Sequence, residues 1–206
     1  MLSLLLIIAY NNFLTFGLKH ILNESYEVTC RISSLSHATV STIVPLLYFC
    51  NIVGDNIVGY CALYNIVYTL SDIYLFQTNK ISSDGKAENI IHHICFIISS
   101  CISYKDPYFY CRGILTEAST IFLNLSWFSY KNKFTPQYLV LYTKLLWVSF
   151  LVFRIININI LVYEIYNSRF KIYSLLGFPF IILNTYWFYL LTNKLIKLKN
   201  NDDKQK

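Results

Sequence analysis

Long runs of apolar residues, separated by short polar segments, dominate the pattern along the 206-residue chain. A helix that crosses a bilayer needs about 20 mostly apolar residues, at a rise of about 1.5 Å per residue. The runs are too long for strands, and a membrane barrel would alternate apolar and polar positions. The pattern therefore predicts an all-α integral membrane protein with about seven transmembrane helices, over residues 2–18, 38–53, 57–77, 89–104, 108–130, 137–163 and 172–195.

Polar segments mark the ends of these predicted helices. Residues 78–88 (TNKISSDGKAE) are the clearest loop, because Ser-Ser-Asp-Gly favours a turn. Lys105-Asp106-Pro107 interrupts the pattern between the fourth and fifth runs. Two adjacent asparagines, Asn11 and Asn12, make the first run the weakest of the set. The last residues, 195–206 (LIKLKNNDDKQK), are polar, and we expect them to be frayed.

The composition indicates that lipid is the main solvent of this chain. Hydrophobic residues make up 55% of it and charged residues only 14%, whereas a soluble domain carries roughly 25% charge. A chain this apolar cannot bury all of its apolar side chains in one core. The composition therefore excludes a soluble enzyme, a disordered chain and a nucleic-acid-binding domain. The six cysteines form no zinc-site spacing, so we predict no metal.

The distribution of Lys and Arg predicts the orientation in the membrane, because cytoplasmic loops carry an excess of both. With seven spans, the loops on the non-cytoplasmic side carry only Lys105, Arg169 and Lys171, and Arg112 lies near that edge of the membrane. We therefore expect a cytoplasmic C-terminus. The cytoplasmic side receives Lys19, Arg31, Lys80, Lys86, Lys131, Lys133, Lys194, Lys197, Lys199, Lys204 and Lys206.

Several polar side chains fall inside the predicted spans, where an ionisable group costs several kcal/mol unless it faces a cavity or a partner. His37, at the start of the second run, and Asp72, the adjacent His92 and His93, and Asn124 come from four predicted helices, yet all lie in the cytoplasmic half. Imidazole titrates near neutral pH and suits proton transfer, and a carboxylate can fix its tautomer. We predict His92, His93 and Asp72 as catalytic residues. An interfacial His pair that is satisfied by water remains the alternative.

A second polar stripe lies on the fifth predicted helix, where Thr116, Glu117, Thr120 and Asn124 share one face at helical spacing. Such a stripe lines a substrate cavity or makes hydrogen bonds between helices. Arg154 is interpreted as a buried partner for a carboxylate such as Glu117. The candidate substrate-binding residues are His37, Glu117, Thr120, Asn124 and Arg154.

At these residues the chain resembles the TLC family, which includes ceramide synthases and translocon-associated membrane proteins. The resemblance implies six helices that form a barrel around a lipid cavity, one extra N-terminal span, and residence in the endoplasmic reticulum or a related membrane. It divides the chain into an N-terminal anchor and loop (1–30), a TLC domain (31–196) and a polar cytoplasmic tail (197–206). The similar pieces are RISSLSHATV (31–40), LSDIYL (70–75), NIIHHICFIISS (89–100), LTEASTIFLNLSWF (115–128), Phe153-Arg154-Ile155 and NTYWF (184–188).

One departure from the ceramide synthases affects the expected function. In the synthases, further acidic residues follow the His pair on the next helix. The matching positions here are Thr116, Glu117, Thr120 and Asn124, of which only Glu117 is acidic. The chain is thus more similar to the non-synthase TLC-domain proteins, which are linked to membrane lipid composition. The resemblance implies that membrane lipids are its partners, that it needs no cofactor, and that acyl-CoA is the co-substrate if it transfers acyl groups. A ceramide-synthase-like N-acyltransferase and a non-catalytic membrane adaptor remain the alternatives.

Overall fold

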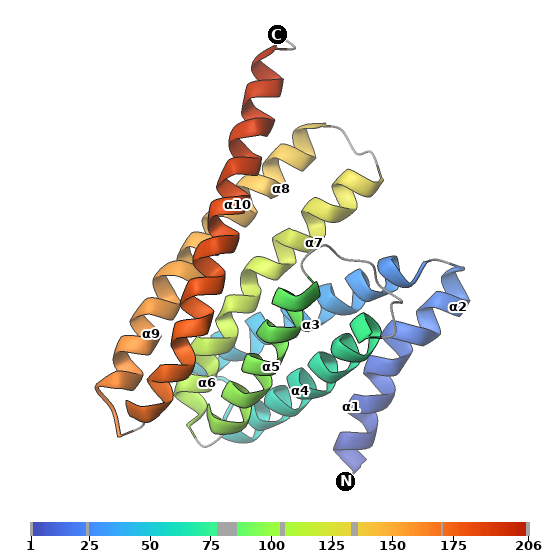
Figure 1. Cartoon of the computed structure of the whole chain (residues 1–206). Coiled ribbons are helices and arrows are strands. Elements are labelled where there is room, and N and C mark those ends of the chain that lie inside the picture. The colour runs from blue at the N-terminus through green and yellow to red at the C-terminus, as the bar shows by residue number, and fades with distance from the viewer. Residues whose placement is uncertain are drawn as a thin grey trace. The chain divides into compact units, whose positions relative to one another are not determined.

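The computed structural model describes residues 2–23, 25–77, 86–103, 106–132, 136–169 and 171–204 (Figure 1). Every regular element in this part of the chain is a helix, which confirms the all-helical prediction. Three helices among the described residues are long and apolar enough to cross a membrane: Tyr26–Phe49, Gln137–Tyr166 and Lys171–Leu198. The further predicted spans and the six-helix barrel stay predictions. The chain divides into two compact units, Met1–Leu115 and Thr116–Lys206, which are described separately.

The first unit is built around α4 (Asp55–Gln77), which packs against the other long helices of the unit. The N-terminal helix consists of α1 (Leu2–Asn12), a π-helical turn η1 (Phe13–Gly17) and α2 (Leu18–Leu22). The others are α3 (Tyr26–Phe49), α5 (Lys86–Ser103) and α6 (Pro107–Ile114). In Figure 1 these elements run from blue to green.

Local capping explains where several of these helices begin and end. Ser25 caps α3 by accepting a hydrogen bond from the backbone N–H of Val28. Asn51 follows α3 with a φ of 57°, the left-handed conformation that Asn tolerates best after Gly. Asp106 caps α6 and Pro107 occupies its first turn, so the predicted break is confirmed. Of the loop predicted at 78–88, residues 78–85 lie outside the described residues, and α5 already begins at Lys86.

The prediction that the second helix begins at residue 38 is wrong, because α3 begins at Tyr26. Its first half is rich in small polar side chains at four-residue spacing, such as Thr29 and Ser33, and these are at most 2% exposed. Apolar side chains of α3 such as Leu46 are instead about half exposed, at 49%. Small polar residues let membrane helices approach closely, and apolar ones face the lipid. A prediction from hydropathy therefore misses the first half of α3, which packs against its neighbours through small polar side chains.

The second unit contains α7 (Ala118–Lys131), α8 (Pro136–Phe150), a π-helical turn η3 (Leu151–Ile156), α9 (Asn157–Tyr166), a 3-10 helix η4 (Lys171–Leu176) and α10 (Gly177–Lys204). A 3-10 turn, η2 (Leu115–Glu117), joins α6 to α7 in the chain. The core of the unit is Leu146, Phe150 and Leu191, and the aromatic side chains of Trp147 and Phe188 pack against it. The expectation of a frayed tail is wrong, because α10 continues to Lys204.

We expect Gly177→Ala to destabilise the second unit by about 1–3 kcal/mol, the usual cost of overpacking. A Cβ at position 177 would overlap Cγ2 of Val162 on α9. Val is β-branched and stiff at χ1, so it cannot rotate away at little cost. Thermal unfolding of the purified protein in detergent measures the effect. Gly54→Ala is the control, because a Cβ there meets nothing within 4 Å; an unchanged melting temperature for Gly177→Ala would contradict the prediction.

Candidate functional site

The side chains of His93 and Asp72 meet in the first unit, where α5 packs on α4. His93 Nε2 lies 3.0 Å from Asp72 Oδ2. Both side chains are mostly buried, with 14% and 15% of their surface exposed. When the Asp72 carboxylate is ionised it only accepts hydrogen bonds, so a neutral His93 ring donates from Nε2 and carries its lone pair on Nδ1. This arrangement fixes the tautomer and the ring orientation of His93, as a general base requires.

The geometry also agrees with the positions of the two residues in their helices. Asp72 lies five residues before the C-terminal end of α4, and His93 lies seven residues after the N-terminal end of α5. At a rise of about 1.5 Å per residue, the two therefore lie roughly 8 Å and 10 Å from the helix ends. The pair is formed near the end of the bundle where α4 finishes and α5 starts.

Tyr68 and His37 extend this pair across a third helix. Tyr68 lies one helical turn before Asp72, and its hydroxyl donates a long hydrogen bond of 3.5 Å to Asp72 Oδ2. The ring of His37, on α3, stacks on the Tyr68 ring with 3.9 Å between ring centroids. His37 is 3% exposed. His37, Tyr68, Asp72 and His93 thus form a continuous row of polar and aromatic groups.

Tyr68 is a member of the site that the sequence interpretation missed. Its spacing of four residues from Asp72 was the available signal, since such residues lie on one helix face. The chain contains 18 tyrosines, and this excess concealed it. In an apolar helix a tyrosine is most simply read as packing or as part of an interfacial belt.

The two adjacent histidines have different surroundings. His93 makes the contact with Asp72 described above. The ring of His92 is 5.6 Å from that of His93 and 6.3 Å from that of Phe96, measured between centroids. Successive residues point about 100° apart on a helix, so the two rings cannot meet the same carboxylate in the same way. The catalytic roles of His92, His93 and Asp72 stay predictions.

Two side chains of α1 also contact the helices that form this site. Asn11 is fully buried, and its Nδ2 donates a hydrogen bond of 2.7 Å to the Ser71 hydroxyl, next to Asp72 in sequence. The neighbouring Tyr10 hydroxyl is 2.9 Å from the Ser36 hydroxyl on α3. Asn11, which weakens the first apolar run, therefore makes a hydrogen bond between helices. This bond holds α1 on α4 beside the His93–Asp72 pair.

A separate buried polar cluster lies in the second unit, around Arg154. Its guanidinium contacts Glu117 Oε1 at 3.5 Å, and both side chains are less than 10% exposed. The interpretation of Arg154 as a buried partner of Glu117 is thereby confirmed. Nε of Arg154 also donates to the Ser119 hydroxyl at 2.7 Å. Its Nη2 donates to the Thr120 hydroxyl at 2.9 Å, and Nη1 donates to Asn184 Oδ1 at 3.4 Å.

The other residues of the second polar stripe belong to the same cluster. The Thr120 hydroxyl donates to Glu117 Oε2 at 2.9 Å, and Asn124 Nδ2 donates to the carbonyl of Thr120 at 3.0 Å. Asn124 is fully buried. The contacts of Arg154 join α7, η3 and α10, as the interhelical alternative predicted. The role of Glu117, Thr120, Asn124 and Arg154 in binding substrate, and the convergence of Asn124 with the His pair, stay predictions.

A comparison of the chain with known protein families identifies its family. The family model of the TLC domain matches residues 3–193, nearly the whole chain. The chain belongs to the TLC-domain family. No curated protein and no solved structure gives a match.

Membership of the TLC-domain family shows that the chain is a multi-pass membrane protein. The match includes the N-terminal helix, so α1 is part of the segment that resembles the family. Among the residues described, no group of three His, Cys, Asp or Glu side chains could hold a metal ion.

Proposed function

We propose that this TLC-domain protein handles membrane lipids by acyl transfer, with His93 as the general base and Asp72 as the residue that orients it. The contact of 3.0 Å between His93 Nε2 and Asp72 Oδ2 carries this proposal. A hydrogen-bonded pair of an imidazole and a carboxylate, both mostly buried in membrane helices, is costly to form and calls for a functional or structural reason. Acyl transfer is a reaction that an oriented imidazole can support without a metal.

The proposed reaction joins an acyl group from acyl-CoA to a lipid hydroxyl or amine. His93 Nδ1 takes the proton of the acceptor group while its oxygen or nitrogen attacks the thioester carbonyl. The new ester or amide bond forms, and the C–S bond breaks. The imidazolium, stabilised by Asp72, then returns the proton to the CoA thiolate. The Tyr68 hydroxyl contacts the same carboxylate oxygen of Asp72 as His93, and the His37 ring stacks on the Tyr68 ring.

Ceramide synthesis is less well supported than transfer to another lipid. Thr120 and Asn124 occupy positions where the ceramide synthases carry acidic residues. The Thr120 hydroxyl is taken up by contacts with Glu117 and Arg154 within the second unit. We therefore expect no or very weak ceramide formation from acyl-CoA and a sphingoid base.

Lipid analysis tests the proposal most directly. Untargeted lipidomics of cells with and without the gene should show a changed acyl composition of one lipid class. The purified protein should then transfer a labelled acyl group from acyl-CoA to that class in vitro. An unchanged lipidome would support the adaptor alternative and contradict the proposal. Robust ceramide formation that disappears in His93→Ala would favour the synthase alternative.

We also propose residence in the endoplasmic reticulum or a related membrane, with a cytoplasmic C-terminus. The His93–Asp72 pair then lies in the cytoplasmic half, where water-soluble acyl-CoA can reach it. A glycosylation tag placed after Lys206 should remain unmodified, because most loop Lys and Arg lie on that side. The same tag inserted at Asp106, between α5 and α6, should be glycosylated. Modification of the C-terminal tag would reverse the orientation and place the pair in the luminal half.

A further inference from the structure

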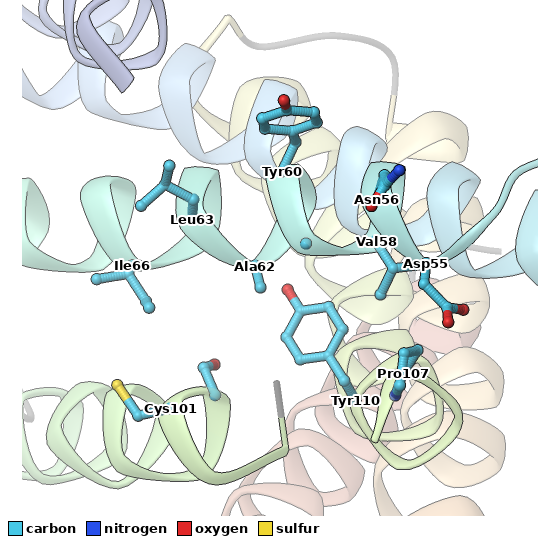
Figure 2. A pocket seen from close by; sticks show the side chains of 12 residues that line it. Asp55, Asn56, Val58, Tyr60, Ala62, Leu63, Ile66, Cys101, Pro107 and Tyr110 are labelled. Carbon is cyan, nitrogen blue, oxygen red and sulfur yellow. The ribbon is translucent and has the colours of Figure 1, made fainter. Parts of the chain in front are cut away.

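A cavity of about 710 Å³ lies in the first unit, between α4, α5 and α6. Figure 2 shows Ala62 and Ile66 of α4 on one side of it, with Cys101 of α5 and Tyr110 of α6 on the other. The volume is within the usual range of roughly 300–1,000 Å³ for small-molecule sites. None of the residues of the His93–Asp72 site lines this cavity. Ile66 precedes Asp72 by six residues, about 9 Å along the helix axis.

The lining changes from polar to apolar along α4. Asp55 and Asn56, at the start of the helix, are exposed. The lining residues that follow on α4 include the apolar side chains of Ala62, Leu63 and Ile66. The distance from Asp55 to Ile66 along the helix is about 16 Å. A polar mouth with an apolar interior of this length fits a single-chain amphiphile, with its headgroup at the mouth.

Ser100 provides a second polar group on the lining. Its side chain is 4% exposed, and it lines the cavity. A hydroxyl both donates and accepts hydrogen bonds, so Ser100 can pair with a polar group of a ligand inside the cavity.

The charge of the lining disfavours an anionic ligand. Asp55 is the one carboxylate among the described lining residues, which include no Lys, Arg or His. A fatty acid or a phosphorylated lipid would be repelled by it. Asp55 also needs no cationic partner, because the N-terminus of α4 stabilises its charge and the Tyr48 side chain lies beside it. Its remaining acceptor capacity suits a hydroxyl headgroup.

We propose that this cavity binds a monoacylglycerol: its free hydroxyls at Asp55 and Asn56, its ester group within reach of Ser100, and its acyl chain along Ala62 and Ile66. This lipid site is separate from the proposed acyl-transfer site, and the proposal for it does not depend on acyl transfer.

A photoactivatable, clickable monoacylglycerol tests this proposal with the purified full chain in lipid nanodiscs. We expect labelling of the α4 segment 55–66 that excess unlabelled monoacylglycerol competes away. Ala62→Phe fills the cavity and should abolish labelling. Ser100→Ala, a milder change, should lower labelling about 2- to 10-fold, the value of one hydrogen bond. Leu70→Phe is the matched control on α4, because Leu70 is 54% exposed and does not line the cavity.

Three results would overturn the proposal. One is labelling of these segments by a photoactivatable fatty acid or sterol at least as strongly as by the monoacylglycerol. Another is full labelling of a folded Ala62→Phe variant. If that variant does not fold, full labelling of Ser100→Ala has the same meaning. His93→Ala should leave labelling unchanged, so loss of acyl transfer and loss of this site are separate outcomes.

Discussion

His93→Ala should lower the rate of acyl transfer by about 10²–10⁴, the usual contribution of a general base. The expectation follows from the contact of His93 Nε2 with Asp72, which leaves Nδ1 as the basic nitrogen. Asp72→Asn should lower the rate as well, because an amide cannot stabilise the imidazolium as a carboxylate does. The measurement is transfer of a labelled acyl group by the purified protein, with protein amount equalised by quantitative blotting.

The controls separate loss of the base from general damage. His20→Ala removes an exposed histidine of the same unit and should leave the rate unchanged. His92→Ala tests the neighbouring ring, which lies beside Phe96. A smaller loss than for His93→Ala is expected, because His93 is the ring in contact with Asp72. Full activity of His93→Ala at normal expression would refute the assignment of the base.

Arg154→Met should destabilise the protein by about 3–5 kcal/mol, the usual cost of breaking a buried ion pair. The variant leaves Glu117 buried and without its positive partner. It also removes the hydrogen bonds to Ser119, Thr120 and Asn184, which join η3 to α7 and α10. Denaturant unfolding in detergent micelles measures the free-energy change. Because total stability is commonly 5–15 kcal/mol, a low expression level is also expected.

A double variant shows whether stability depends on the ion pair itself or only on the absence of an unpaired buried charge. Arg154→Met with Glu117→Leu removes both charges and should recover part of the lost stability, since apolar pairs often replace buried ion pairs without loss. Lys194→Met is the matched control, because it removes an exposed cation from α10 of the same unit. Equal stability of Arg154→Met and Lys194→Met would contradict a structural role for the cluster.

The buried polar side chains explain how this chain can be both apolar and rich in hydrogen bonds. Thr29, Ser33, Asn65 and Asn124 are at most 2% exposed, whereas large apolar side chains such as Ile182 are up to 70% exposed. In a soluble protein this distribution would be unfavourable, but lipid is as apolar as a protein core. Helices then associate through polar contacts and close packing. The family membership and the burial pattern therefore agree on a membrane protein.

The sequence by itself determined the helical class, most helix ends and the chemistry-bearing residues. These features depend on local signals: the length of an apolar run, a capping residue such as Asp106, and the cost of an ionisable group in lipid. The pairing of Arg154 with Glu117 was also predictable, because a buried cation requires a nearby anion. The start of α3 was predicted wrongly, since its polar stripe lowers the hydropathy that the prediction relied on.

Only the tertiary structure decided which polar groups meet. It placed His93 on Asp72, put Tyr68 on the same carboxylate, and brought Asn11 to Ser71. These contacts depend on the rotation of each helix about its axis and on the helix beside it. Neighbouring residues in sequence differ by about 100° around a helix, so a small rotation exchanges one histidine for the other. That rotation is set by the packing of α4 and α5, which no local pattern in the sequence contains.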